Sequence, residues 1–479
     1  MSDERWTSPL GTRYASPAMQ RLWGEPHRIG LWRRIWLALA EAERELGLPI
    51  SEEALAQMRA HLDDADLTAA ARYERRFRHD VMAHVHAFAD QAPAARPFLH
   101  LGATSAFVTD NADLVVMRDG LRLLLGRVIA VLSSLEGFAE RTAGIPCLAY
   151  THFQPAQLTT VGKRATLWMQ DFGLDVEELS HRIETLRFRG CQGTTGTQAS
   201  FLELFGGDDA KVRELERRVT AKLGFREQFA VTGQTYSRKA DSQILDALSG
   251  VAQSAAKMAV DLRLLQHEGE LLEPFEAEQI GSSAMAYKRN PMRAERISGL
   301  ARFVISLQAN GAHTAAAQWL ERTLDDSANR RLTLPEAFLG TDAILVLATN
   351  IAAGIEVRED VIRRNLMEKM PFMATERWLM LGVAAGGDRQ ALHEVIRRHS
   401  LAVAEAVAQG APNDLLERLG ADSAFADIPA ADLRAQLDPV NYTGRATRQV
   451  GEFLDEYLRP LLARARPLAA EAGSAEVRV

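Results

Sequence analysis

The stretch of sequence best equipped for chemistry lies between residues 281 and 296 and reads GSSAMAYKRNPMRAER. Its glycine permits unusual backbone angles, its two serines supply hydroxyl groups, and Lys288 and Arg289 add positive charge. Asn290 and Pro291 favour the end of irregular backbone and the start of a helix. A charged, hydroxyl-bearing loop between helices is typical of a lid that closes over an anionic small molecule.

A second stretch, YTHFQPAQLTTVGKR, contains His152 among polar neighbours such as Thr151. Because Pro155 is compatible with a helix that starts just after it, we expect His152 in the loop before a helix N-terminus. Backbone N–H groups at such a terminus favour anions, and a histidine there can exchange a proton with a bound ligand. A purely structural role for His152 is the alternative.

A third stretch, RFRHDVMAHVH, runs from residue 76 to residue 86. On a helix, Asp80 and His84 share one face, which is a possible metal-binding spacing, but no third ligand follows at a matching spacing. Surface or interface histidines are a second interpretation. The third is a polar pocket in which His79, flanked by Arg78 and Asp80, contacts an anionic substrate.

A fourth stretch, ERTLDDSANRR, places Arg322, Ser327 and Arg331 close together in the sequence. Two guanidinium groups with a hydroxyl group suit the recognition of a phosphate. The alternative is a solvated ion-pair surface that uses the acidic residues Asp325 and Asp326.

Composition narrows the class of protein. The chain has 479 residues, of which 47% are hydrophobic and 25% charged, so it can bury a large core. A net charge of -7 argues against nucleic-acid binding driven by overall charge, yet it allows a local basic pocket. Two cysteines, no secretory signal and no run of about 18 apolar residues indicate a cytoplasmic protein without a membrane span.

Apolar residues recur at helical spacing along nearly the whole chain. A helix is expected over residues 29–46, ended by Gly47, and Ser51 is expected to cap the next one. Long helices are expected over about 111–140 and 157–186 and around the heptad pattern of 244–265. No strand is expected.

Helices of about 35 to 45 Å need partners of similar length, so they indicate a bundle. Their apolar stripes are wide, which favours an oligomer over a monomeric bundle. The composition indicates three parts: residues 1–104, the long helices of 105–357 and an alanine-rich region of 358–479.

Together these stretches resemble the fumarase/aspartase superfamily. GSSAMAYKRNP is similar to the superfamily loop GSSxMPxKxNP. TSPLGTRYASP, HLGATS, GTTGTQASF and TGQTYSRK, with the stretches around His79, His152 and Arg322, resemble the adenylosuccinate lyase family, of the type found in animals. The resemblance covers nearly the whole chain.

The resemblance implies an all-α fold of three domains, whose long helices join those of three other subunits in a homotetramer with a 20-helix core. Active sites would then lie where three subunits meet. The implied reaction is the β-elimination of fumarate from adenylosuccinate and from the related purine intermediate SAICAR. It implies no metal or organic cofactor, and no nucleic-acid or membrane partner.

The matched motifs also imply roles for individual residues. Ser282 would be the general base, His152 the general acid, Lys288 a stabiliser of charge and His79 a second polar partner of the substrate. The substrate would be bound by residues from several motifs: Arg13, Tyr14, Arg78, Asp80, Thr104, Ser105, Thr151, Gln234, Asn290, Arg296, Arg322, Ser327 and Arg331.

One departure from the superfamily pattern is Ala286, where the pattern has proline. Since proline restricts the backbone, alanine at this position is expected to make the loop more mobile without removing a reactive group. Two other functions remain open. One is a related fumarate-releasing lyase, for example one that acts on argininosuccinate, and the other is a non-catalytic helical scaffold derived from such an enzyme.

Overall fold

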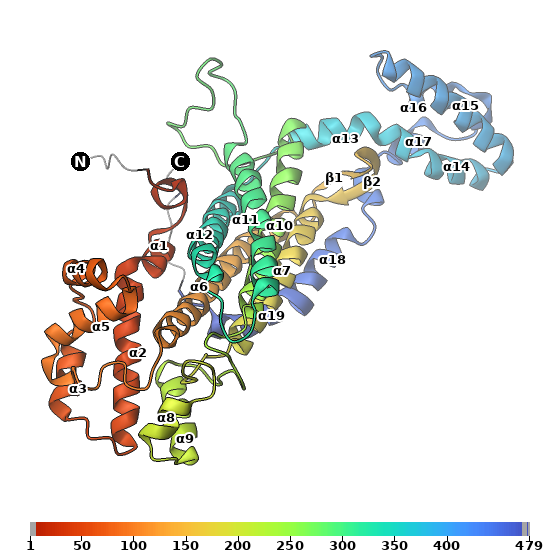
Figure 1. Cartoon of the computed structure of the whole chain (residues 1–479). Helices are drawn as coiled ribbons and strands as arrows, with labels where there is room; N and C mark the ends of the chain where they lie inside the picture. The colour runs from red at the N-terminus through yellow and green to blue at the C-terminus, as the bar shows by residue number, and fades with distance from the viewer. Residues whose placement is uncertain (1–5, 472–476, 478–479) are drawn as a thin grey trace.

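Five long helices form the centre of the protein in the computed structural model, which describes residues 6–471 and 477. Figure 1 shows them running side by side as an elongated bundle. They are α6 (Ser105–Thr142), α7 (Val161–Thr185), α10 (Lys239–His267), α11 (Met292–Ala317) and α12 (Asp325–Gly354). The all-α fold with a central bundle of long helices is therefore confirmed.

The expected apolar stripes are the buried faces of these helices. On α10 the heptad positions from Ile244 to Leu265 are all buried, which confirms the seam that their spacing predicted. On α6 buried side chains surround the helix almost completely, because neighbouring helices cover it on several sides. The helix α6 begins at Ser105, several residues before the expected start, and α7 begins at Val161, several residues after it.

The N-terminal helices pack at one end of the bundle (Figure 1). They are α1 (Pro17–Trp23), α2 (Glu25–Glu45), α3 (Glu52–Ala60), α4 (Leu67–Phe77) and α5 (Asp80–Gln91). Gly47 follows α2 with a φ angle of 103°, and the Ser51 hydroxyl accepts a hydrogen bond of 3.1 Å from the Ala54 N–H. Both signals of a helix end and a helix start are thus confirmed. Two short helices, α8 (Ala199–Leu204) and α9 (Asp209–Lys222), lie nearby, and α9 packs against α2.

Two small antiparallel sheets contradict the prediction that the chain has no strands. The first pairs β1 (Pro146–Thr151) with β2 (Gln154–Thr160), and the second pairs β3 (Leu271–Leu272) with β4 (Glu356–Val357). In the first sheet Leu148 lies opposite Leu158, and both are buried against α13 (Glu359–Met373). The strand β2 has only a weak signal in the sequence, because QPAQLTT contains a proline and mostly polar residues.

The C-terminal region divides into a part with its own core and a part that returns to the bundle. The separate core lies among α14 (Thr375–Ala384), α15 (Arg389–Ala408), α16 (Leu415–Ala421) and α17 (Ala430–Ala435). The returning helices, α18 (Ala446–Glu452) and α19 (Arg459–Ala465), pack against α7. The division of the chain at residues 104 and 357 stays a prediction.

One described helix, α12, has the length and apolar composition of a membrane span. However, 72% of its most apolar window is buried inside the protein, which is typical of a central bundle helix.

Candidate active site

A pocket of about 740 Å³ lies where the N-terminal helices meet the bundle. Nine of the residues predicted from the sequence line it: Arg78, His79, Asp80, Thr104, Ser105, Gln234, Arg322, Ser327 and Arg331. They come from the ends of α4, α5, α6 and α12 and from the segment before α10. The fold thus brings together four stretches that are far apart in the sequence.

His79 is fixed at the N-terminus of α5. Its Nδ1 accepts a hydrogen bond of 3.3 Å from the Met82 N–H, so the proton of the neutral ring is on Nε2. Nε2 lies 3.2 Å from the Ser105 hydroxyl oxygen, to which it can donate. The preceding residue, Arg78, ends α4 in the left-handed region with a φ angle of 54°. His79 therefore has a defined tautomer and faces a hydroxyl group inside the pocket.

Arg331 and Asp80 form an ion pair across the pocket, with 3.0 Å between Nη2 and Oδ2. Both side chains are partly exposed, so the pair is weak and a ligand can compete for either partner. The guanidinium group of Arg331 is therefore accessible to an anion.

A buried network of charges lies behind Arg322. The Arg322 Nη1 group donates to both carboxylate oxygens of Asp326, at 3.1 and 3.2 Å, and Arg238 Nε donates to Oδ2 at 2.7 Å. Arg238 also donates to both oxygens of Asp110, at 3.0 and 3.1 Å. Burial alone would raise the pKa of Asp110, but Arg238 and Arg330 hold it below its ordinary value. Asp326 is fully buried, so it does not belong to a solvated ion-pair surface, contrary to the alternative interpretation of this stretch.

His152 lies outside this pocket, at the tip of the β1–β2 hairpin. Contrary to the prediction, it does not precede a helix directly, because β2 separates it from α7. Thr151 pairs with Gln154, and the two residues between them, His152 and Phe153, have φ angles of 52° and 58°. Two positive φ angles are typical of the tight turn that matches the twist of a hairpin, although Asn and Gly usually occupy it. The imidazole is exposed at the tip.

Ser282 lies in the loop between β3 and α11. Its hydroxyl oxygen accepts hydrogen bonds from two backbone N–H groups, those of Ala284 at 3.3 Å and Met285 at 3.1 Å. Two such donors stabilise negative charge on the oxygen, as a serine that acts as a base requires. Lys288 is exposed on the same loop.

The two arms of this loop are joined at its base. The Asn290 side chain donates to the Gly281 carbonyl oxygen at 2.7 Å, and a side chain at Gly281 would clash with the Lys288 carbonyl oxygen. Arg289 forms an ion pair of 2.8 Å with Glu356. Glu273 accepts hydrogen bonds from the first N–H groups of α11, those of Arg293 and Ala294. The base is rigid, while residues 283–288 are exposed.

A further pair, Tyr14 and Arg296, lies near the start of α11. The Arg296 guanidinium carbon is 5.9 Å from the centre of the Tyr14 ring. The segment that carries Arg13 and Tyr14 is held on α12, because the Ser16 N–H donates to Asp342 at 2.6 Å. Arg13 is exposed.

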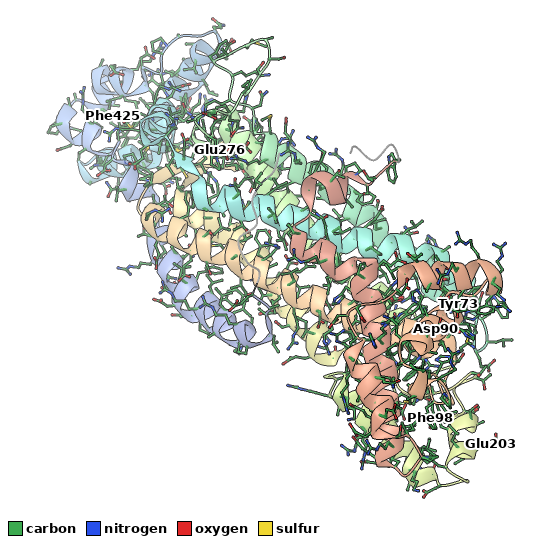
Figure 2. The ribbon with its side chains drawn as sticks, turned by 90° about the vertical axis from the view of Figure 1, so that its left-hand side faces the viewer. Tyr73, Asp90, Phe98, Glu203, Glu276 and Phe425 are labelled. Carbon is green, nitrogen blue, oxygen red and sulfur yellow. The ribbon has the colours of Figure 1, made fainter. Side chains whose placement is uncertain are left out.

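The predicted residues thus form groups at opposite ends of the bundle. Ser105 starts α6 at the pocket, and the hairpin with His152 follows the other end of this 38-residue helix, about 55 Å away. The loop with Ser282 precedes α11, whose 26 residues separate it from Arg322 by about 40 Å. In Figure 2, Glu276 of the loop lies toward the C-terminal helices, whereas Tyr73 and Asp90 lie at the pocket end. Neither His152 nor Ser282 reaches the pocket of its own chain.

Comparison with known proteins places the chain in a family. A protein-family model described as "Lyase" matches residues 20–306, and a second family model, described as "Adenylosuccinate lyase C-terminus", matches residues 371–453. Adenylosuccinate lyases of Saccharomyces cerevisiae and Schizosaccharomyces pombe are 48% and 47% identical to it, over 95% and 96% of both chains. The enzyme of Schistosoma mansoni is 46% identical over 96% of both. The chain belongs to the adenylosuccinate lyase family.

Solved structures show how widely this family's fold is shared. The crystal structure of 3-carboxy-cis,cis-muconate lactonizing enzyme from Pseudomonas putida has a TM-score of 0.80 and 24% identity, and covers 96% of this chain and 99% of its own. A fumarate lyase from Mesorhizobium sp. BNC1 has a TM-score of 0.77 and 24% identity, and covers 94% of this chain and 98% of its own. At this identity the likeness concerns the fold alone.

The charged residues behind the pocket are not among the site residues that the sequence motifs predict. Asp110, Arg238, Asp326 and Arg330 all line the pocket, and all are buried. Arg238 lies within TGQTYSRK, where Gln234 is the predicted site residue, and for Asp326 the sequence leaves a solvated surface position open as an alternative. Buried ion pairs join segments distant in sequence, so no local pattern indicates them. In the described part of the chain, no group of three or more His, Cys, Asp or Glu residues could hold a metal ion.

Proposed function

We propose that this protein is an adenylosuccinate lyase of purine nucleotide biosynthesis, which releases fumarate from adenylosuccinate to give AMP and from SAICAR to give AICAR. The observation that carries the proposal is the 46–48% identity to adenylosuccinate lyases over 95% or more of both chains. The pocket, the hairpin and the loop supply the groups that this reaction needs.

The reaction removes a proton from a carbon next to a carboxylate and expels a nitrogen from the neighbouring carbon. Ser282 takes the proton, and the two N–H groups on its oxygen, with Lys288, favour the charge that this requires. His152 protonates the leaving nitrogen from the opposite side. This acid–base chemistry requires no metal ion or organic cofactor.

The remaining predicted residues bind the substrate. Arg322, Ser327 and Arg331 provide two guanidinium groups and a hydroxyl group on one wall of the pocket, which suits the 5′-phosphate. His79, Ser105 and Thr104 form a polar wall beside them, which suits the carboxylates and the amine of the succinyl group.

We further propose that the protein is a homotetramer in which each active site combines groups from three subunits. The separation of His152 and Ser282 from the pocket of their own chain supports this arrangement. The bundle helices also carry exposed apolar side chains that a second copy would cover: Leu167, Leu174, Val260, Leu264, Phe303 and Leu332. Five long helices in each of four subunits would make the 20-helix core.

A cytoplasmic location is part of the proposal. The two cysteines, Cys147 and Cys191, are free and buried, and burial raises the pKa of the Cys147 thiol to about 11. Unreactive thiols of this kind fit a reducing compartment.

A fumarate-release assay tests the proposed activity. The purified protein is mixed with adenylosuccinate, SAICAR or argininosuccinate, and fumarate and the second product are quantified. We expect fumarate with AMP from the first substrate, fumarate with AICAR from the second and no product from the third. Release from argininosuccinate alone, or from none of the three, would refute the proposal.

A further inference from the structure

We infer that Asp326 is a positioning residue for phosphate recognition: its buried carboxylate holds the Arg322 guanidinium group against the pocket and ties it to the bundle. The inference rests on the proposed function, because it assigns the 5′-phosphate of the substrate to Arg322. It adds a residue that does not touch the substrate and for which the sequence left a surface position open as an alternative.

Arg322 needs a positioning group because of where it lies. It belongs to the connection between α11 and α12, in which Leu320 has a φ angle of 51° and is 87% exposed. A guanidinium group on such a connection loses side-chain entropy when it binds an anion, and this loss weakens binding. A group that already holds Arg322 in place removes part of that cost.

Asp326 has the geometry for this task. It is the second residue of α12, so its side chain reaches back toward the connection, and both of its oxygens accept from Arg322 Nη1. Among the described residues, Arg322 Nε and Nη2 have no hydrogen-bond partner. Those two donors form the edge of the guanidinium group that suits two phosphate oxygens. The contact with Asp326 therefore orients Arg322 without occupying this edge.

Asp326 is itself fixed by a chain of buried ion pairs. Arg238 donates to its Oδ2 at 2.7 Å and binds both oxygens of Asp110 on α6, and all three side chains are at most 3% exposed. Asp110 lies on the helix whose first residue is Ser105, the partner of His79. The Gln234 N–H donates to the Glu321 carbonyl oxygen at 3.0 Å, which joins the same segments through the backbone. The network thus sets the position of the phosphate-binding arginine relative to the wall that receives the succinyl group.

The first test compares Asp326→Asn with Asp325→Asn. Asp325 is a matched control, because it is the neighbouring carboxylate, is exposed and does not line the pocket. Among the described residues, its side chain accepts a hydrogen bond only from the Thr323 hydroxyl, at 3.0 Å. Each variant is assayed with adenylosuccinate and with its dephosphorylated nucleoside, succinyladenosine. We expect Asp326→Asn to raise KM for adenylosuccinate by about tenfold or more, with kcat changed less than about threefold and kcat/KM for the nucleoside nearly unchanged.

A purely structural role predicts a different result. General damage to the pocket would lower kcat/KM for both substrates by the same factor, and this outcome would overturn the inference. An unchanged KM in Asp326→Asn would overturn it as well. Asp325→Asn is expected to behave as the unmodified protein with both substrates.

The double variant Arg322→Gln/Asp326→Asn tests whether Asp326 acts through Arg322. If it does, adding Asp326→Asn to Arg322→Gln should lower kcat/KM by less than about twofold, because the guanidinium group that Asp326 positions is already absent. The two changes would then be far from additive in free energy. Full multiplication of the two single effects would contradict the inference.

Two further measurements cover other outcomes. If Asp326→Asn does not fold, as judged by circular dichroism, Asp326→Glu replaces it, because it keeps the charge and displaces it by one methylene group. Asp326→Glu with an unchanged preference for the phosphorylated substrate would overturn the inference. Calorimetric titration with AMP and adenosine needs no turnover, so it tests phosphate recognition even if the assay of fumarate release fails. We expect AMP to lose at least about tenfold in affinity in either variant, and adenosine to lose little.

Discussion

His152 has a left-handed backbone conformation that residues other than glycine rarely adopt. Both turn residues of the β1–β2 hairpin, His152 and Phe153, have positive φ angles, and this costs on the order of 1 kcal/mol for each. Strain of this kind persists where the surrounding structure over-determines it, and functional sites are a common place for it. The hairpin thus presents the imidazole away from its own chain, as the proposed role of an acid for another subunit requires.

Replacement of the proposed acid or base is expected to remove most of the activity without unfolding the protein. Ser282→Ala and His152→Ala should each lower kcat by about 10² to 10⁴-fold, since each removes one proton-transfer group. Circular dichroism and thermal unfolding should match the unmodified protein, because both side chains lie in exposed or half-exposed loops. Near-normal turnover in Ser282→Ala would remove this serine from the mechanism.

At this scale the sequence identified the residues that face the pocket better than those that support them. His79, Arg322 and Arg331 stand in polar motifs, where residue type suggests a binding role and the resemblance to a known family favours it over the alternatives. The burial of Asp326 is not predictable from its neighbours, because two consecutive aspartates before a helix are also typical of a solvated surface. Its burial depends on Arg238 and Asp110, which are distant in the sequence.

The loop between β3 and α11 is an element with a fixed base and an exposed tip. Residue 286 lies in the exposed part, and its backbone N–H has no hydrogen-bond partner among the described residues, so a proline fits there. We expect Ala286→Pro to slow hydrogen exchange of the loop amides, because the proline stabilises the ordered loop by about 0.4 to 1 kcal/mol. Activity should be retained, because the change removes no reactive group.

A proline two residues earlier provides the control. Ala284→Pro removes the N–H group that donates to the Ser282 oxygen, so it should lower kcat sharply. If Ala286→Pro changes neither exchange nor turnover, residue 286 does not govern the order of the loop.

The helix α2 contains a carboxyl group whose burial makes stability depend on pH. Glu43 is fully buried, neither of its oxygens has a hydrogen-bond partner within the described residues, and burial raises its pKa to about 9. The unfolded chain loses this proton near its ordinary pKa of 4.5, whereas the folded chain keeps it. Stability is therefore lost as the pH rises from about 4.5 to 9, by about 3 kcal/mol at pH 7.

The isosteric variant Glu43→Gln has an amide that does not titrate, so its stability should not show this pH dependence. We expect the difference in thermal unfolding temperature, variant minus unmodified protein, to increase steadily between pH 5.5 and pH 8. A difference that stays constant over this range would mean that Glu43 is already ionised in the folded protein.

Elements were predictable where one period extends over many residues. The seam of α10 repeats over three heptads, so its burial followed directly from spacing. The β1–β2 hairpin was missed because its strands are short and are stabilised by packing on α13 rather than by a local pattern. The same cause displaced the start of α7, since the helix was expected from about residue 157, whereas residues 157–160 belong to β2.

At the scale of the whole molecule, a single chain contains every proposed group but no complete site. The pocket and the two loops lie at opposite ends of helices about 40 to 55 Å long, and the helices between them expose apolar side chains. Association of subunits with antiparallel bundles would bring the hairpin of one copy and the loop of a second copy to the pocket of a third. The apolar stripes in the sequence favour an oligomer, and only the resemblance to a known family implies a shared site, because the distance between its groups depends on where the helices begin and end.

Mixing of two inactive variants tests the shared site most directly. His152→Ala and Ser282→Ala are each purified, unfolded together in equal amounts and refolded, and fumarate release is compared with that of each variant treated alone. If His152 and Ser282 of one site come from different subunits, random mixing restores both in about a quarter of the sites, and this fraction of normal activity returns. If the mixture is no more active than the separate variants, the acid and base belong to one chain, and the proposed arrangement of the active site is wrong.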